Sequence, residues 1–337
     1  MVTTSCPPGK TATMVILVGV DEAGYGPNYG PLAVAATAWS VPDSEADRFP
    51  GPAWDGIFSS GRPSAGESAL WIADSKSIYQ PGRGLGLLER AVLPLAAIAD
   101  GQTAIAESWR QLLQSLSPGA VERLGRLPWY ADDLLTELPR DADRNELGSL
   151  AEKLAAQLQQ RETSIVSMAV RLLTAEDFNE GIRQYDNKGE LLSRTSLELV
   201  CSIMEQYPAE PVVVHCDKHG GRNRYADLLQ ELFPDYLVEI HGEGRELSCY
   251  RWGPPGCRRE IRFAMGGESF LPVALASMTA KYLRELAMTA FNSFWQQQQP
   301  DLRPTAGYPQ DARRFAGEID EIRQQLEIEN DLLWRCR

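Results

Sequence analysis

Two adjacent carboxylates stand where an apolar run meets a glycine-rich bend. Residues 15–20 are apolar, Asp21 and Glu22 follow directly, and glycines recur at positions 24, 26 and 30. A short apolar run is typical of a buried strand, so both acids are expected at a strand end. Because an unpaired buried carboxylate is costly, they need solvent, hydrogen bonds or cations. Taken alone, the pair also fits a β-turn with two solvated acids.

Two further acids lie at similar breaks. Asp217 ends the apolar run 211–216, and Glu268 follows a strand-like segment and two glycines. If these strands are neighbours, four carboxylates converge, and they raise each other's pKa values unless cations bind between them. Carboxylate oxygens suit Mg²⁺ or Mn²⁺. Two such ions serve in-line displacement at a phosphodiester, one orienting the attacking hydroxide and one stabilising the leaving 3′-oxygen. The predicted catalytic and metal-binding residues are Asp21, Glu22, Asp217 and Glu268.

The composition is that of an ordinary globular protein. The 337 residues are 43% hydrophobic and 23% charged, and the formal net charge is −13. This charge argues against a protein that binds polyanions through bulk charge, but not against a nucleic-acid enzyme with a local basic groove and bound metals. Six scattered cysteines without a CxxC pair predict reduced thiols and a cytoplasmic protein. No apolar run is long enough for a transmembrane helix. Residues 1–13 are expected to form a loose tail. The apolar run that follows is too short for a signal peptide and ends at once in Asp21 and Glu22.

Strand and helix signals alternate along the chain, which predicts an α/β fold in one domain over residues 14–337. The second strand pairs with the first as a hairpin. After the first strand, further strands are expected at 32–41, 102–108, 164–173, 211–217, 235–241, 247–252 and 259–265. Helices are expected at 86–98, 189–206 and 225–233, from near Pro272 onward, and at 310–330, with a loop at 42–68.

Residues 109–162 predict a helical insertion that packs on the main sheet or forms a small subdomain. Helix formers dominate this segment, and polar or proline-containing breaks interrupt it at 117–119, 127–133 and 139–146. Its Trp129 and Tyr130 would stack on bases or be buried beneath a capped helix, and the second interpretation is favoured.

The segment at 19–36, GVDEAGYGPNYGPLAVAA, resembles the opening motif of the type 2 ribonucleases H, which reads roughly G-[VI]-D-E-[AS]-G-[RK]-G. Further segments follow in the order of that family. Residues 74–76 resemble its D-S-K motif, Asp217 matches the acid of a later core strand, Glu268 with residues 276–281 resembles G-[DE] followed by A-S-[IL]-x-A-K, and residues 307–310 resemble G-Y-x-T, with Gln310 in place of Thr.

The resemblance implies a ribonuclease H-like α/β fold, with a mixed sheet flanked by helices, and a DEDD or DEDE set of metal ligands. It also implies endonucleolytic cutting of the RNA strand of RNA–DNA hybrids, leaving 3′-hydroxyl and 5′-phosphate ends. The expected partner is a hybrid or a ribonucleotide-containing duplex, and the expected state is a monomer. Glu at position 268 is closer to the ribonuclease HIII set. Matching positions imply substrate contacts by Gly24, Tyr25, Gly26, Ser75, Lys76, Lys281 and Tyr308.

Tyr25 departs from the family pattern, which has Arg or Lys in the loop that grips the 2′-hydroxyl and the adjacent phosphate. Tyrosine hydrogen-bonds and stacks but carries no positive charge. We therefore expect weakened recognition of a single embedded ribonucleotide, while cutting of longer hybrids survives. An arginine-bearing hairpin at 245–262 would hold the phosphate backbone or simply be solvated. His219 is expected in a surface turn rather than as a proton shuttle.

Two other classes of function fit part of the sequence. A non-catalytic nucleic-acid-binding relative is suggested by Tyr25, although all four acids are present. An actin-like or sugar-kinase-like ATPase would also open with a G-x-D-x-G hairpin on a related fold. Against it, the chain has no second glycine-rich phosphate hairpin followed by an aspartate.

Overall fold

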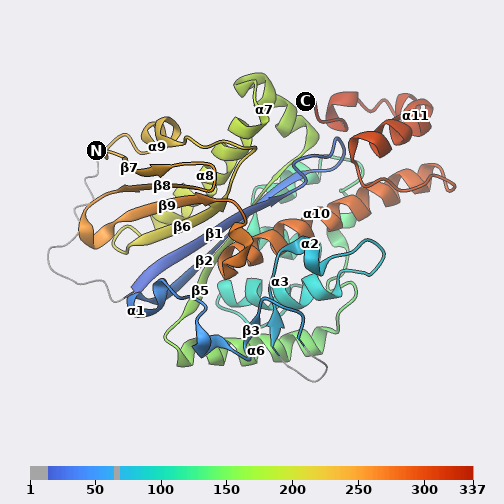
Figure 1. The fold of residues 1–337 in the computed structure, drawn as a ribbon. Coiled ribbons are helices and arrows are strands. Elements are labelled where there is room, and N and C mark those ends of the chain that lie inside the picture. Colours follow the sequence, from blue (N-terminus) through green and yellow to red (C-terminus); the bar gives the residue numbers. More distant parts are fainter. Residues whose placement is uncertain (1–13, 64–68, 337) are drawn as a thin grey trace.

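A mixed seven-stranded sheet forms the centre of the molecule, in the order β5-β2-β1-β6-β9-β8-β7 (Figure 1). The computed structural model describes residues 14–63 and 69–336, so the predicted tail at 1–13 lies outside the described residues. The strands are β1 (Met14–Ala23), β2 (Leu32–Pro42), β5 (Ser164–Leu173), β6 (Val212–Asp217), β7 (Glu239–Glu243), β8 (Leu247–Trp252) and β9 (Arg259–Ala264). The predicted α/β fold with a mixed sheet flanked by helices is confirmed.

Three parallel strands lie side by side within this sheet. β1 pairs in parallel with β6, and β6 pairs in parallel with β9. β2 is antiparallel to both β1 and β5, as the predicted hairpin requires. β8 and β7 complete the other side in antiparallel fashion, and β7 is exposed along its whole length with a register shift between Ile240 and Gly242. The carboxyl ends of β1, β6 and β9 therefore lie at one edge of the sheet.

Both faces of the sheet are buried at its central strands, and β1 contributes to each face. Val15 and Leu17 belong to one apolar core, while Ile16, Val18 and Val20 belong to the other. This alternation explains why the strand reads as a continuous apolar run. The first core is covered by α10 (Leu271–Gln298), α3 (Gly86–Ala99) and α6 (Arg144–Gln160), and the second by α8 (Lys188–Gln206) and α9 (Ala226–Leu232) (Figure 1).

The segment at 109–162 is helical and packs beside α3 and β5. Its elements are α4 (Trp109–Leu116), α5 (Ala120–Leu124), η2 (Asp133–Leu135) and α6. The buried carboxylate of Glu89 in α3 accepts hydrogen bonds from the backbone amides of residues 140–142 and from the Tyr282 hydroxyl of α10. This carboxylate ties the segment to both helices. Trp129 and Tyr130 are buried, so they are core residues rather than a stacking surface for bases.

The structure differs from the sequence prediction at two elements. Residues 102–108 form no strand, because Ser108 instead caps α4, its hydroxyl accepting from the amide of Gln111 at 3.3 Å. A helix that was not predicted, α7 (Ala175–Tyr185), begins at a capping box of Thr174 and Asp177.

The loop at 42–68 contains α1 (Asp43–Ala46), η1 (Pro52–Trp54) and β3 (Phe58–Ser59), the last paired with β4 (Leu70–Trp71). The remaining elements are α2 (Ser75–Ile78), η3 (Pro255–Cys257), η4 (Gly267–Ser269), α11 (Pro309–Gln325) and η5 (Asn330–Leu332).

The thiols agree only partly with the prediction. Cys201, Cys216, Cys249 and Cys336 are free. Cys257 is disulfide-bonded, so the expectation of reduced cysteines is wrong at that position. Over the described ranges, no helix combines the length and apolar character needed to cross a membrane.

The arginine-bearing hairpin uses much of its charge internally. Glu260 of β9 pairs with the guanidinium groups of Arg251, at 2.6 Å, and Arg262. Arg259 donates to the carbonyl groups of Tyr207 and Glu210. These contacts leave less free positive charge for a phosphate backbone than the sequence suggests, and they join β8, β9 and the turn before β6.

Gly19 is the point where α10 lies closest to β1. A methyl group at this position would lie 2.1 Å from the carbonyl carbon of Pro272 and 2.2 Å from the amide nitrogen of Val273. Because both atoms are main chain, relief requires α10 to move. We expect Gly19→Ala to lower the free energy of unfolding by about 3 kcal/mol. The control Gly148→Ala, in α6 with open space around it, should raise it by about 0.5–1 kcal/mol. Urea denaturation of both variants tests this, and equal effects would contradict it.

The pairing of Glu260 with Arg251 and Arg262 predicts a pH-dependent stability. Burial opposes ionisation, but the hydrogen bonds and charges of the two arginines prevail and hold the pKa of the Glu260 carboxyl below its usual value of 4.5. Its stabilising effect is therefore complete above pH 4.5 and is lost as the pH falls through the lower folded-state pKa. Glu260→Gln should cost about 1 kcal/mol at pH 7. In melting experiments from pH 7 to 3, the difference from wild type should shrink only below pH 4.5; a constant difference would contradict the prediction.

Candidate active site

Asp21 and Asp217 lie side by side at the carboxyl ends of neighbouring parallel strands. The register pairs Val20 with Cys216, and each aspartate is the next residue along its strand. The apolar residues that precede the two aspartates are buried in the core, and their burial fixes the position of both strands in the sheet. The two strands that carry Asp21 and Asp217 are therefore neighbours, and their role as catalytic acids stays a prediction.

Glu22 adds a third carboxylate to this edge. Burial, followed by the charges of Asp21 and Asp217, raises the pKa of Glu22 to about 8, while the charge of Lys76 opposes this rise. The main-chain amide of Glu22 donates to Oδ1 of Asp21 at 2.8 Å. Asp21 and Asp217 thus act electrostatically on Glu22, as expected for carboxylates gathered at one edge.

Glu268 belongs to η4, which follows β9 and turns back over the end of β6. A methyl group on its neighbour Gly267 would lie 3.7 Å from the amide nitrogen of Asp217 and 3.7 Å from the carbonyl oxygen of Cys216. The main chain of this turn therefore runs beside Asp217. The side chain of Glu268 lies outside the described part of the structure, so its role as the fourth acid stays a prediction.

The chemistry of these acids suits a hard divalent cation, because all their donor atoms are carboxylate oxygens. However, among the residues whose side chains are described, no three Asp, Glu, His or Cys side chains are grouped closely enough to hold a metal ion. Asp21, Glu22 and Asp217 thus share an electrostatic environment without forming a closed ligand shell, and the predicted pair of ions stays a prediction.

The D-S-K segment meets α10 next to these acids. Asp74 caps α2 by accepting from the amide of Lys76 at 3.1 Å. Ser75 is buried, and its hydroxyl accepts from the Ser277 hydroxyl of α10 at 3.0 Å. Lys76 is exposed, and its charge is close enough to affect Glu22. Ser75 therefore joins two motifs that are 202 residues apart, whereas Lys76 lies exposed at the surface near Glu22.

Lys281 is engaged elsewhere on α10. Its ammonium group lies 2.6 Å from Oε1 of Glu285 and 4.5 Å from the centre of the Tyr79 ring. The Tyr79 hydroxyl donates to the other oxygen of Glu285 at 2.8 Å. A phosphate contact by Lys281, which the motif implies, would compete with this ion pair.

The glycine-rich bend exposes part of its main chain beside the acids. Gly24 adopts a φ of +90°, and any side chain there would collide with Arg284 and the carbonyl oxygen of Pro31. Gly26 is exposed, and a methyl group on it would lie 3.9 Å from the Tyr308 ring. Tyr308 is itself 56% exposed, so it is a surface neighbour of the bend rather than a core residue. The amide of Asn28 donates to the carbonyl of Gly307 at 2.7 Å and joins the two segments.

Tyr25 spans from this bend to the loop after β6. Its hydroxyl lies 3.0 Å from the position of a methyl group on Gly220, and 4.0 Å from that on Gly189 at the start of α8. Burial, followed by the charge of Glu22, raises the pKa of the Tyr25 phenol. Tyr25 is therefore half-buried between two glycines, beside the carboxylates.

His219 differs from the expected surface turn, because it is buried. Its Nδ1 lies 3.1 Å from the Ser193 hydroxyl, and its main-chain amide donates to the Tyr225 hydroxyl at 3.1 Å. Burial lowers the pKa of His219 to about 3. These contacts make it a packed residue that fixes the loop after Asp217, which sequence periodicity had no means to reveal.

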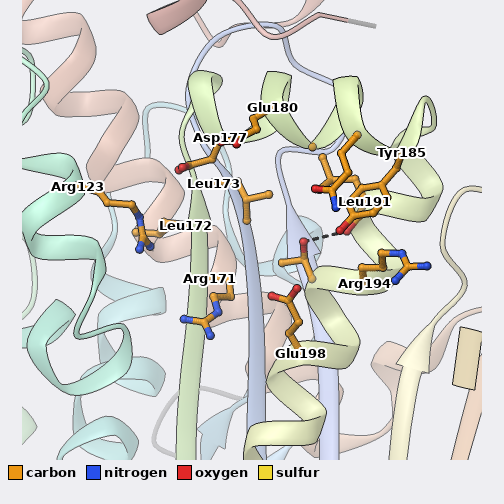
Figure 2. Close-up of a pocket in the computed structure, with 13 residues that line it drawn as sticks. Arg123, Arg171, Leu172, Leu173, Asp177, Glu180, Tyr185, Leu191, Arg194 and Glu198 are labelled. Atoms are coloured by element: carbon orange, nitrogen blue, oxygen red, sulfur yellow. Dashed lines mark hydrogen bonds between the residues drawn. The ribbon is translucent and has the colours of Figure 1, made fainter. Parts of the chain in front are cut away.

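A separate surface pocket of about 290 Å³ opens near the edge strand β5. Figure 2 shows Arg123 reaching toward it from α5, with Asp177 and Glu180 of α7 above and Arg194 and Glu198 of α8 opposite. None of the predicted site residues lines it. Arg194 already pairs with Glu190 and Glu231. The pocket is therefore distinct from the carboxylate edge.

The sequence matches no protein-family model and no curated protein. Among solved structures, ribonuclease H2 from Pyrococcus horikoshii OT3 aligns with 94% of this chain and 92% of its own, at 14% identity and a TM-score of 0.38. Ribonuclease HII in the PCNA complex from Archaeoglobus fulgidus aligns with 96% and 94%, at 15% identity and a TM-score of 0.38. Bst-RNase HIII in complex with Mn²⁺ aligns with 95% and 66%, at 17% identity and a TM-score of 0.36.

Similarity at this level assigns no activity, substrate or metal. The order β5-β2-β1-β6-β9, with β1, β6 and β9 parallel, describes the fold directly. The chain resembles the type 2 ribonucleases H in the sequence motifs that stand at the ends of these strands.

Proposed function

We propose that this protein is a metal-dependent ribonuclease H that hydrolyses the RNA strand of RNA–DNA hybrids. The observation that carries the proposal is the placement of Asp21 beside Asp217 at the ends of two parallel strands, with Glu22 affected by both charges. Three acids of like charge at one edge favour a function that uses positive charge there. The order of the motifs along the chain supports the same assignment.

In the proposed reaction, water attacks the phosphorus of a ribonucleotide phosphodiester and the bond to the 3′-oxygen breaks. The products are a 3′-hydroxyl and a 5′-phosphate. Bound Mg²⁺ or Mn²⁺, two ions in the proposed mechanism, would activate the water and offset the charge that develops on the phosphate. Asp21, Glu22 and Asp217 would hold the metal, with Glu268 as a fourth ligand. Lys76 would add a positive charge at the exposed side.

The hybrid would lie across the exposed bend, where Gly26 allows a phosphate backbone close to the main chain and Gly24 provides the φ of +90° that shapes the bend. Tyr308 lies next to Gly26 and offers a ring and a hydroxyl to the same strand. We assign Ser75 a supporting part, since its hydroxyl faces Ser277, and Lys281 a contact only after its ion pair with Glu285 opens.

We also propose that the protein is cytoplasmic. Free thiols support a reducing, cytoplasmic setting, whereas the disulfide at Cys257 opposes it. A monomer suffices for the proposed chemistry, because every acid named above comes from one chain.

The central test is cleavage of three labelled duplexes: a full RNA–DNA hybrid, a DNA duplex with one ribonucleotide, and plain DNA. Wild type should cut the hybrid with Mg²⁺ or Mn²⁺ and lose this activity in a chelator. Asp21→Asn should reduce the rate on the order of a hundredfold or more. Its melting temperature should stay equal or rise, because the charge of Asp21 is one of the causes that raise the pKa of the buried Glu22 and oppose its ionisation.

The matched control is Asp301→Asn, which changes an exposed aspartate on the loop after α10 and should leave cleavage unchanged. Hybrid binding without cleavage in either metal would favour the non-catalytic relative. A metal-dependent nucleotide complex in native mass spectrometry would favour the ATPase class.

Tyr25 should decide how the enzyme treats an isolated ribonucleotide. Because tyrosine carries no positive charge, wild type should cut the hybrid faster than the duplex with one ribonucleotide. Tyr25→Arg should shift the ratio of the two rates toward the single ribonucleotide by about tenfold, equivalent to about 1.4 kcal/mol. Tyr25→Phe serves as the control that keeps the ring and lacks a charge. Equal cutting of both duplexes by wild type would refute impaired junction reading.

A further inference from the structure

Arg335, close to the carboxyl end of the chain, contacts the glycine-rich bend from inside the molecule. Its side chain is completely buried, with 0% exposure. One nitrogen, Nη2, donates to the carbonyl groups of Gly24 and Pro27. These two carbonyls bracket Tyr25 and Gly26. Because the carbonyl and amide of a trans peptide point in opposite directions, the amide of Tyr25 is directed away from Arg335.

The main chain of Arg335 is joined to the same bend. Its amide donates to the carbonyl of Asn28 at 2.9 Å, and the side-chain amide of Asn28 donates to the carbonyl of Arg335 at 3.0 Å. Side-chain and main-chain contacts together hold the bend at Gly24, Pro27 and Asn28.

The segment that carries Arg335 is itself fixed on α7. The buried side chain of Asn179 donates to the carbonyl of Trp334 at 2.8 Å and accepts from the amide of Cys336 at 2.7 Å. The Trp334 ring meets the Tyr29 ring edge to face, with centres 5.3 Å apart. The bend is therefore connected to α7 through the last residues that the structure describes.

Holding a guanidinium here is costly. In the described part of the chain, Nε and Nη1 of Arg335 have no hydrogen-bond partner. Burial, followed by the charge of the nearby Arg284, lowers the pKa of Arg335 to about 9. An apolar side chain of similar volume is often as stable as a buried, incompletely paired charge. What arginine supplies, and an apolar residue does not, is a charged donor shared by two carbonyls.

We propose that Arg335 is a positioning residue that sets the main-chain orientation of the bend over Gly24, Tyr25 and Gly26 for substrate. The inference rests on the proposed nuclease function, but it concerns a residue outside the motifs that suggested that function. Arg335 is 311 positions from Gly24 in the sequence, and it acts through the main chain of the bend rather than by touching substrate.

The test compares Arg335→Met with Arg259→Met in the full chain. Arg259 also donates to two main-chain carbonyls, but it lies at the start of β9, away from the carboxyl end where the candidate site is. In Arg335→Met, hydrogen exchange of the amides at 24–30 should speed up by about tenfold or more. The kcat for hybrid cleavage should fall by a similar factor, and Arg335→Lys should recover part of it. Arg259→Met should change loop exchange and kcat by less than about twofold, since its contacts lie away from the bend.

Unchanged exchange at 24–30 in Arg335→Met would overturn the proposal, as would an equal loss of kcat in Arg259→Met. If Arg335→Met does not fold, Asn179→Leu carries the same test, because it releases the segment without altering the bend. If wild type cuts no duplex, the nuclease proposal fails, while the exchange measurement still decides whether Arg335 holds the bend.

Discussion

The parallel pairing of β1 with β6 is the contact on which the rest of the site depends. It aligns Val20 with Cys216 and so places two aspartates next to each other. Moving one strand by a single residue would turn its acid to the opposite face of the sheet. The two apolar cores prevent this, because alternate residues of β1 are buried on both sides. Burial thus fixes the register, and the register gathers the charges.

The same charges make the site unfavourable for folding by itself. Glu22 lies near two other acids, and both its burial and their charges oppose the ionisation of its carboxyl group. The fold tolerates this edge because α10 is anchored elsewhere, through its close contact with Gly19 and the Ser75–Ser277 hydrogen bond. Stability and chemistry are therefore carried by different residues: apolar strands and a close helix contact for one, strand-end carboxylates for the other.

The sequence predicted the parts of the fold that depend on periodicity. The runs before Asp21 and Asp217, the hairpin of β1 with β2, and the long helix after Pro272 were recognisable because burial leaves a regular pattern. The strand predicted at residues 102–108 does not form, because Ile105 is the only buried apolar residue of this segment and Ser108 caps α4. The T-x-x-D pattern of Thr174 and Asp177 is the sequence signal for the start of α7.

The surroundings of the site residues were beyond reach of the sequence. Nothing in the motifs indicates that Tyr25 lies between Gly189 and Gly220, that Lys281 pairs with Glu285, or that His219 is buried. Those facts depend on contacts between distant segments.

Within residues 14–63 and 69–336, no strand pairs with the outer side of β7, and this has a consequence for how the protein behaves in concentrated solution. A terminal strand with unpaired amides and carbonyls can recruit a strand from another molecule and start aggregation. Here Glu239 and Glu243 place negative charges at both ends of the strand, and the shift between Ile240 and Gly242 interrupts its regular spacing. A second copy of β7 would meet charges of the same sign and an interrupted pattern of hydrogen-bonding groups. This border of the sheet therefore resists self-association even though the apolar side chain of Ile240 is exposed.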